Sequence, residues 1–174
     1  MGNYFLDNQD IQFLFEHINL AEIAEIQELH AENGQADYGP LDSADTVDNY
    51  RRTLDIVGAV AADTIAPNAE QVDREGNTLN EDGTVTLHPN VRENLFRMSQ
   101  AELMGFTLPR KYGGLNCPNL IYTMATEIVS RADASFMNMF GLQGIAETVN
   151  AFASQEIKDA VLPRFAEGHV TGAM

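Results

Sequence analysis

The fold class follows from one stretch of the chain, SADTVDNYRRTLDIVGAVAADTI at residues 43–65. Its apolar side chains recur at steps of three and four residues, at Val47, Tyr50, Leu54, Val57, Ala61 and Ile65. This spacing places all six on one face of an α-helix, and Ser43 or Asp45 is suited to cap its N-terminus. The stretch therefore predicts one amphipathic helix, which we expect to end near Pro67.

Helical spacing also precedes this stretch, and a polar segment follows it. Residues 10–31 repeat apolar side chains at three and four residues, and we predict a helix there. Two glycines and a proline at 33–40 then indicate a loop. Residues 71–87 are rich in turn formers and predict a surface excursion, in which the run at 84–87 is able to pair in a small ribbon.

Two more helices are predicted to begin at prolines. Pro89 and Pro118 suit helix starts, because a proline in the first turn has no N–H to leave unpaired. For the helix that starts at Pro89, we place a left-handed C-terminal residue at Gly105.

The last two helices are predicted from polar caps. Asp133 is expected to cap a helix that runs to about Ala153, and Ser154 one that runs to about Ala166. The side chains expected on the inner side of the last helix are Ile157, Val161, Leu162 and Phe165. Six or so helices joined by short loops predict an all-α bundle.

Composition excludes several functional classes. The 174 residues are 44% hydrophobic, enough for one core, and 26 acidic against 10 basic residues give a net charge of −16. Nucleic acids and anionic membranes are therefore unsuitable partners. No apolar run approaches the ~20 residues of a membrane span, and the histidines are too scattered for a metal site. We predict a cytoplasmic protein with no membrane span, no nucleic-acid partner and no bound metal.

The negative charge is concentrated at the N-terminus. The first 50 residues hold eleven acidic side chains and no Lys or Arg, yet they are too apolar for a free tail. We therefore divide the chain into an acidic, partly helical extension at residues 1–42 and a helical domain at 43–174. The extension either packs on the domain or on a partner, or it forms an acidic docking surface. We expect its deletion to leave the helices of the rest largely intact.

Few residues carry the pattern of a chemical site. Cys117 has no adjacent base and is interpreted as an ordinary thiol. A group of flexible and aromatic side chains surrounds Gly141 and Gly144, namely Phe136, Met137, Met139, Phe140 and Leu142. Such a group is able to line a pocket for an apolar chain, and ordinary packing between helices explains it equally well.

Four segments carry a resemblance to a known family. They read IAPNAEQVDREG at 65–76, MGFTLPRKYGGL at 104–115, EIVSRADAS at 127–135 and KDAVLPRFAEG at 158–168. In their order and spacing, over about residues 47–174, they resemble the N-terminal α-helical domain of the FAD-dependent acyl-CoA dehydrogenases. The first residues resemble a bacterial subgroup with an N-terminal extension.

The resemblance implies a role in the oxidation of an acyl-CoA to the trans-2-enoyl-CoA, a step of fatty acid β-oxidation. It implies FAD as cofactor, an electron-transfer flavoprotein as partner and a homo-oligomer. The family's catalytic glutamate and most flavin contacts belong to a middle β domain and a C-terminal helical domain. We therefore expect no catalytic residue in this chain, and neither FAD binding nor activity from this chain alone.

The resemblance also implies roles for particular residues. The residues that match the family's acyl-pocket wall are Phe136, Met137 and Phe140, with Gln143 and Gly144 as weaker candidates. Met174 matches the threshold of the flavin loop and is the candidate cofactor-binding residue. Two alternatives stay open, a stand-alone helical protein-interaction module and an acyl-binding domain without redox chemistry.

Overall fold

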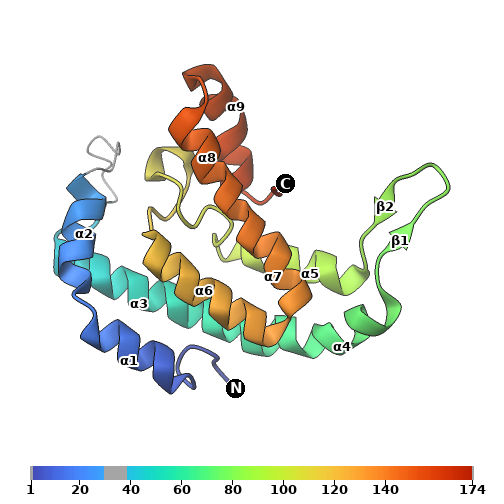
Figure 1. Ribbon diagram of the computed structural model, residues 1–174, viewed down its shortest axis with the longest axis horizontal. Coiled ribbons are helices and arrows are strands. Elements are labelled where there is room, and N and C mark those ends of the chain that lie inside the picture. Colours follow the sequence, from blue (N-terminus) through green and yellow to red (C-terminus); the bar gives the residue numbers. More distant parts are fainter. Residues whose placement is uncertain (1, 30–38, 174) are drawn as a thin grey trace.

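The chain has the all-α architecture that its sequence predicts. The computed structural model describes residues 2–29 and 39–173 (Figure 1). Its helices and strands are α1 (Gln9–His17), α2 (Leu20–Leu29), α3 (Ser43–Val60), α4 (Ala66–Glu75), β1 (Thr78–Leu79), β2 (Val85–Thr86), α5 (Pro89–Gln100), α6 (Asn119–Ala132), α7 (Ala134–Gly141), α8 (Ile145–Phe152) and α9 (Gln155–Ala166). Helix α6 packs on α3, α7 lies along α6, and α8 and α9 form a pair at one end of the molecule.

The helix that was expected to end near Pro67 continues through it. A π turn at Ala61–Ile65 joins α3 to α4, and the N–H of Ala66 bonds to the carbonyl of Ala61. Pro67 lies in the first turn of α4, directly after this interruption. A proline is tolerated there because its missing N–H coincides with a break in the regular hydrogen-bond ladder. The predicted helix end was therefore wrong, because the helical chain continues through Pro67 to Glu75, with Val72 buried on α4.

The helix predicted at 10–31 is two helices. Asn8 caps α1 by accepting hydrogen bonds from the N–H groups of Asp10 and Ile11. The chain becomes extended at Ile18, and Asn19 then starts α2 by bonding to the carboxylate of Glu22 at 3.1 Å. Asparagine favours such helix starts over helix interiors, because its side chain bonds to nearby polar groups. The loop predicted at 33–40 lies largely outside the described residues.

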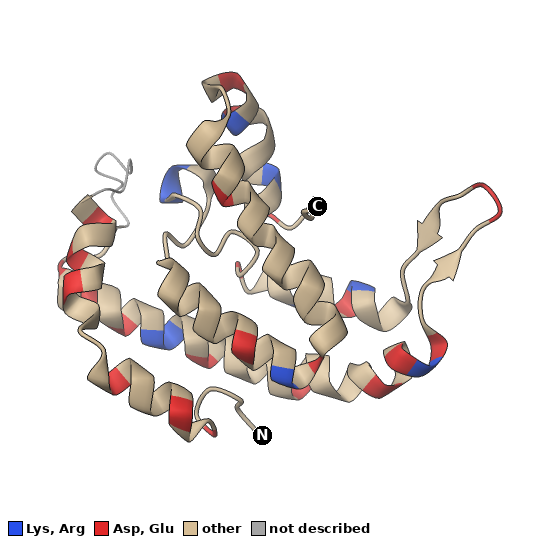
Figure 2. Cartoon of the chain, in the orientation of Figure 1, with Lys and Arg blue, Asp and Glu red and all other residues tan. Residues whose placement is uncertain are grey.

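The N-terminal segment belongs to the main hydrophobic core. Its buried side chains pack with those of α3 and α6, and they are Phe5, Ile11, Phe15, Leu20 and Ala24. The backbone of Phe5 passes so close to Gly58 that a β-carbon there would lie 2.6 Å from the Phe5 nitrogen. Figure 2 shows acidic residues along the helices α1 to α4. Of the two alternatives that the sequence left open for this segment, packing on the helical domain is therefore the one that the structure supports.

Two details of the C-terminal half differ from expectation. The left-handed residue after α5 is Glu102, at φ 59°, and Gly105 serves a different purpose. A β-carbon on Gly105 would lie 2.8 Å from that of Ala166, so the glycine allows the loop to approach α9. Ile157 is half exposed because only the C-terminal part of α9 packs, through Leu162 and Phe165.

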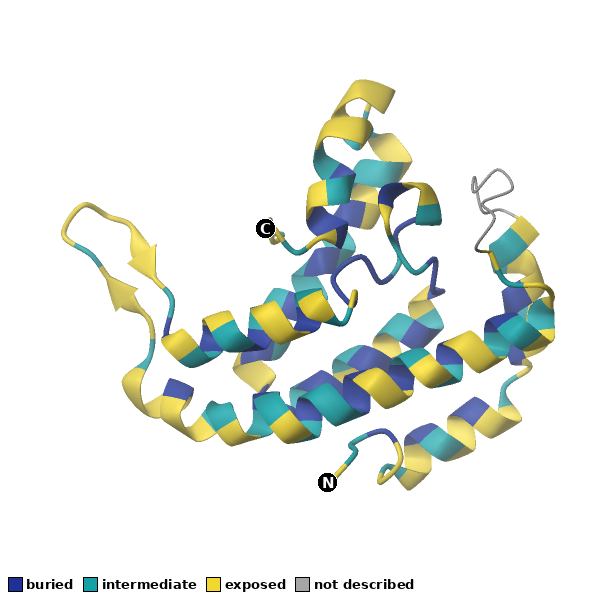
Figure 3. Cartoon of the chain, turned by 180° about the vertical axis from the view of Figure 1, so that it is seen from behind, coloured by how far each residue is buried: buried dark blue, intermediate teal, exposed yellow. Residues whose placement is uncertain are grey.

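The single helix predicted from Asp133 to about Ala153 is wrong, since a 3-10 turn at Leu142–Gly144 divides it into α7 and α8. The other helix starts and the ribbon agree with their predictions. Pro118 precedes α6, Asp133 caps α7 and Ser154 caps α9. The ribbon pairs β1 with β2 in antiparallel register and projects away from the helices (Figure 1). Figure 3 shows buried and exposed residues alternating along α3, as an amphipathic helix requires. Within the described ranges, none of the helices is long and apolar enough to cross a membrane.

Candidate functional site

The candidate site is built on helix α7, whose start is fixed by Asp133. One carboxylate oxygen of Asp133 accepts hydrogen bonds from the N–H groups of Ser135 and Phe136, at 2.8 and 3.1 Å. The other oxygen, Oδ2, is buried without a hydrogen-bond partner among the described residues. This cap sets the rotation of α7, and with it the direction of each side chain that follows.

Phe136 and Phe140 point into the protein's own core. They stand one helical turn apart and are 2% and 1% exposed. The Phe140 ring meets Tyr122 at 5.4 Å and Phe106 at 6.1 Å between centroids, both edge to face. Edge-to-face contacts of this kind add to the gain from burial. The rings therefore hold α7 in place and present little surface outward.

Met137 lies on the adjoining face of α7. It is half-buried, and a β-carbon on Gly141 would approach its sulfur to 3.3 Å. Gly144, one turn further on, leaves room beside the ring of Tyr122. Met137 and Gly144, two of the predicted wall residues, thus form a partly exposed apolar track together with Gly141, which lies between them.

The helix is interrupted directly after this track. A 3-10 turn at Leu142–Gly144 separates α7 from α8, which leaves carbonyls at the end of α7 in need of donors. The Tyr122 hydroxyl lies 2.7 Å from the carbonyl oxygen of Phe140 and 2.9 Å from that of Gly141, and donates there. Burial raises the pKa of Tyr122 to about 12, so the hydroxyl keeps its proton.

Gln143 lies beneath the C-terminal segment. It is 4% exposed, and its amide nitrogen is 3.5 Å from the carbonyl oxygen of Val170. Its Oε1 has no partner within the part of the chain that the structure describes. Gly172 packs so tightly on the same turn that a β-carbon would lie 2.2 Å from the Leu142 oxygen. Gln143 therefore supports the segment that leads to Met174, which itself lies outside the described residues.

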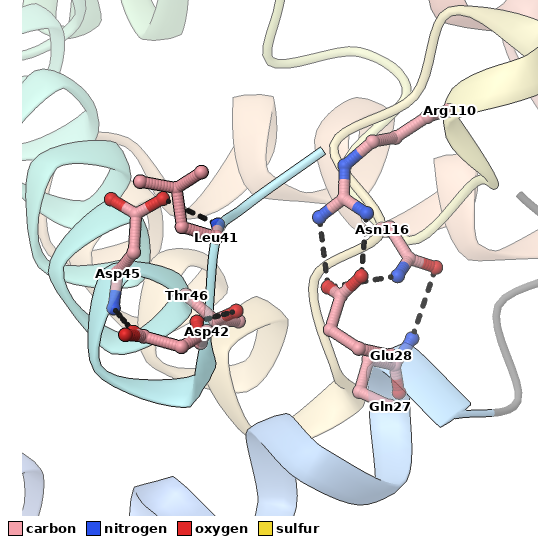
Figure 4. A network of polar contacts seen from close by, with 8 residues as sticks. All are labelled: Gln27, Glu28, Leu41, Asp42, Asp45, Thr46, Arg110 and Asn116. Atoms are coloured by element: carbon pink, nitrogen blue, oxygen red, sulfur yellow. Dashed lines mark hydrogen bonds and ion pairs between the residues drawn. The ribbon is translucent and has the colours of Figure 1, made fainter. Parts of the chain in front are cut away.

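A second feature is a partly buried ion pair that holds α2 to the loop before α6. Both terminal nitrogens of Arg110 bond to the carboxylate of Glu28, at 2.6 and 2.8 Å. Asn116 connects this pair to Gln27 (Figure 4). Its amide nitrogen donates to the Glu28 carboxylate, and its amide oxygen accepts from the Gln27 side chain, each at 3.3 Å. Asn116 has a φ of 53°, a conformation that asparagine adopts more readily than most residues. The N-terminal segment is thus tied to the domain by charge as well as by apolar packing.

Metal and thiol chemistry find no support in this geometry. Within residues 2–29 and 39–173, no group of three His, Cys, Asp or Glu side chains is placed to bind an ion. Burial raises the pKa of Cys117 to about 12, so its thiol stays protonated near neutral pH. This agrees with its interpretation as an ordinary thiol.

The sequence did not indicate Tyr122 or Phe106 as members of the site. Both contact Phe140 across separations of 18 and 34 residues, and neither belongs to the Phe and Met cluster that attracted attention. The only local feature of the sequence that could have indicated these two residues is their position in the chain. Tyr122 lies one turn after Pro118, and Phe106 lies in the glycine-rich segment that resembles the family.

Comparison with known proteins assigns the chain to a family. Residues 48–169 match the family model described as acyl-CoA dehydrogenase, N-terminal domain. The chain belongs to the acyl-CoA dehydrogenase family. This confirms both the resemblance and the expected fold.

Three curated relatives illustrate the range of the match. A mitochondrial isovaleryl-CoA dehydrogenase from Arabidopsis thaliana is 33% identical over 68% of this chain and 27% of its own length. A mitochondrial 2-methylacyl-CoA dehydrogenase from Solanum tuberosum is 30% identical over 73% of this chain and 29% of its own length. A 3-methylmercaptopropionyl-CoA dehydrogenase from Ruegeria pomeroyi is 26% identical over 95% of this chain and 26% of its own length. The chain thus spans less than a third of each relative.

Proposed function

We propose that this chain supplies one wall of the acyl pocket in an FAD-dependent acyl-CoA dehydrogenase. The complete protein would oxidise an acyl-CoA to the trans-2-enoyl-CoA, act as a homo-oligomer and pass its electrons to an electron-transfer flavoprotein. The observation that carries the proposal is the apolar track of Met137, Gly141 and Gly144, in a chain whose residues 48–169 match the family model. The predicted cytoplasmic location stays a prediction.

The proposed wall has an outer and an inner layer. Met137 and Gly144 would contact the acyl chain, because they lie on the partly exposed face of α7 and the turn after it. Phe136 and Phe140 would act from behind, since their buried rings set the position of that face. Gln143 would hold the C-terminal segment against the same turn, and Met174 would continue it toward the flavin.

The proposal places the flavin site in other parts of the complete protein. The track is apolar, and the unpaired oxygen of Gln143 is an acceptor covered by the C-terminal segment. Neither feature suits the phosphates of FAD, which need donors and positive charge. When bound in the complete protein, the flavin would accept the hydride. This chain's residues would exclude water and position the acyl group.

Substitution of Met137 tests the outer layer. In the complete protein, Met137→Ala should shift the dependence of kcat/KM on acyl chain length toward longer or bulkier groups, because it enlarges the pocket. Met139→Ala is the matched control, since Met139 is a half-buried thioether on the same helix. Identical chain-length profiles for the two variants would remove Met137 from the wall.

The 174-residue chain tests the assignment of the flavin. We expect it to bind no FAD in equilibrium dialysis and to leave an acyl-CoA unoxidised in the presence of an artificial electron acceptor. Stoichiometric binding of FAD by this chain would contradict the assignment of the flavin site to other domains.

A further inference from the structure

The ribbon of β1 and β2 is joined to the helices by a buried histidine at its base. His88 lies between β2 and α5, where the chain returns from the ribbon to the body of the molecule (Figure 1). It is 7% exposed, whereas His17 and His169 are exposed. The proposed acyl pocket uses neither His88 nor the ribbon, so the role of this side chain is a separate question.

His88 holds three segments together. Its backbone N–H donates to Oδ1 of Asn77, which precedes β1, at 2.9 Å. Its ring Nε2 lies 2.9 Å from Oε2 of Glu75, the last residue of α4. Its ring Nδ1 accepts the N–H of Asn90, in the first turn of α5, at 3.1 Å. The end of α4, the base of the ribbon and the start of α5 thus meet at one residue.

These contacts decide which ring nitrogen carries the proton. A backbone N–H only donates, so Nδ1 is the unprotonated nitrogen when it caps α5. The proton of the neutral ring then lies on Nε2 and is donated to the Glu75 carboxylate. Hydrogen bonds from Gln71 and His88 lower the pKa of Glu75, so this carboxylate is charged when it accepts. Neutral His88 therefore satisfies both of its neighbours.

A second proton on the ring removes one of these contacts. Protonated Nδ1 is a donor and would face the N–H of Asn90, which is also a donor. The positive charge would also lie at the N-terminus of α5, where the helix dipole is unfavourable to a cation. The contact with Glu75 remains, because Nε2 keeps its proton. Protonation therefore removes the cap of α5 and leaves an ion pair with α4.

Glu75 is the charged side chain that contacts the His88 ring among the described residues. The other charged residues of α4, the ribbon and α5 are Glu70, Asp73, Arg74, Glu81, Asp82, Arg92, Glu93 and Arg97. Within the described ranges, none of these forms a hydrogen bond or ion pair with the ring. The balance between the cap and the ion pair at His88 therefore depends on Glu75.

We propose that His88 is a proton-sensitive clamp at the base of the ribbon. The neutral ring holds the end of α4 to the start of α5, and protonation releases the start of α5 and loosens its junction with the ribbon. The ribbon presents two exposed apolar side chains, Leu79 and Val85, which pair across its strands. The clamp is independent of the proposed acyl pocket and acts between about pH 5 and 8, where histidines change charge.

NMR spectroscopy of the 174-residue chain tests the clamp. At pH 8, the nitrogen shifts of the His88 ring should show its proton on Nε2. As the pH falls to about 5, the amide proton of Asn90 should move to lower frequency with the same midpoint as the ring, because it loses its acceptor. The hydrogen-exchange rate of the Glu93 amide, corrected for the intrinsic effect of pH, should rise about fivefold, as expected for the loss of a helix cap.

Two substitutions separate the cap from the ion pair. His88→Asn keeps an acceptor suited to a helix cap but has no ring to protonate, so the Asn90 amide should lose its pH dependence. Glu75→Gln keeps the ring and removes its charged partner, so the transition should move to lower pH. Glu70→Gln is the matched control, since Glu70 lies on the same helix and pairs with Arg74, and it should leave the transition unchanged.

The proposal would be overturned by a proton on Nδ1 at pH 8, or by an Asn90 amide that does not follow the His88 ring between pH 8 and 5. A pH dependence of Asn90 that persists in His88→Asn would overturn it too. If His88→Asn folds poorly, the Glu75→Gln variant decides. Equal midpoints for this variant and the parent would then count against the clamp.

Discussion

Replacement of Ile11 by alanine tests whether the acidic N-terminal segment is part of the hydrophobic core. Ile11 lies on α1 and is 0% exposed. Truncation of a buried isoleucine costs about 2–5 kcal/mol, and a typical domain has only about 5–15 kcal/mol of stability. In a chain of this length, each kcal/mol changes Tm by about 2–4 °C, so a cost of about 3 kcal/mol lowers Tm by about 6–12 °C.

The control is Leu14→Ala on the same helix. Leu14 is 43% exposed, so its truncation removes less buried surface and should cost under about 1 kcal/mol. Both variants are compared with the parent by urea unfolding, followed by far-UV circular dichroism. A decrease for Ile11→Ala no larger than that for Leu14→Ala would refute the reasoning and show that the segment packs loosely.

Deletion of residues 2–29 extends the same argument. It removes four large buried side chains, Phe5, Ile11, Phe15 and Leu20. At about 1.5–3 kcal/mol each, their burial contributes about 6–12 kcal/mol, which equals the whole stability of many domains. We therefore expect the deletion to abolish cooperative unfolding. This revises the expectation that the helices of the rest would persist after deletion of residues 1–42.

Three further variants test individual contacts. Asp133→Ala removes the cap of α7 and should cost about 1–2 kcal/mol in urea unfolding, whereas Asp133→Asn keeps the acceptor and should cost less. Arg110→Gln leaves Glu28 partly buried without its partner and should cost up to about 3 kcal/mol. Glu28→Gln in the same chain should recover part of this loss, and additive effects would show that the pair is not coupled. Above its ordinary pKa of 9.0, the Cys117 thiol ionises when unfolded but not when folded, where its pKa is about 12. The unfolded chain then binds fewer protons, so stability should fall as pH rises from 9 to 12, and less steeply in Cys117→Ala. Equal pH slopes of Tm would contradict that prediction.

Local signals in the sequence predicted the helix starts well. Pro118, Asp133 and Ser154 act through the backbone within a few residues of themselves, so their effect needs no knowledge of the fold. The apolar face of α3 could be predicted for the same reason, because its periodicity lies within a single helix. Pro67 misled the prediction because a π turn next to it removes the conflict that normally ends a helix.

Contacts between segments that lie far apart in the chain could not be predicted from the sequence. The ring cluster joins Phe106, Tyr122 and Phe140, and the ion pair joins Glu28 to Arg110 across 82 residues. No periodicity within a single helix specifies which residue of another helix it meets. The composition of α1 and α2 left two alternatives open, because their acidic residues suit a docking surface and their apolar residues suit packing on the domain. The buried Phe136 and Phe140 likewise show that a cluster of large side chains, by itself, does not distinguish a pocket wall from a core.

The ion pair gives the N-terminal segment a role beyond burial. Glu28 holds Arg110, and the same loop contains Gly114, where a β-carbon would lie 2.1 Å from the carbonyl oxygen of Leu108. Gly105 in turn approaches Ala166 of α9 too closely for a side chain. Because each of these contacts leaves almost no free space, α2, the loop and α9 are packed closely one upon the next. The Ruegeria pomeroyi relative aligns over 95% of this chain, against 68% and 73% for the two plant relatives. The alignment with that relative therefore includes most of the N-terminal segment that carries Glu28.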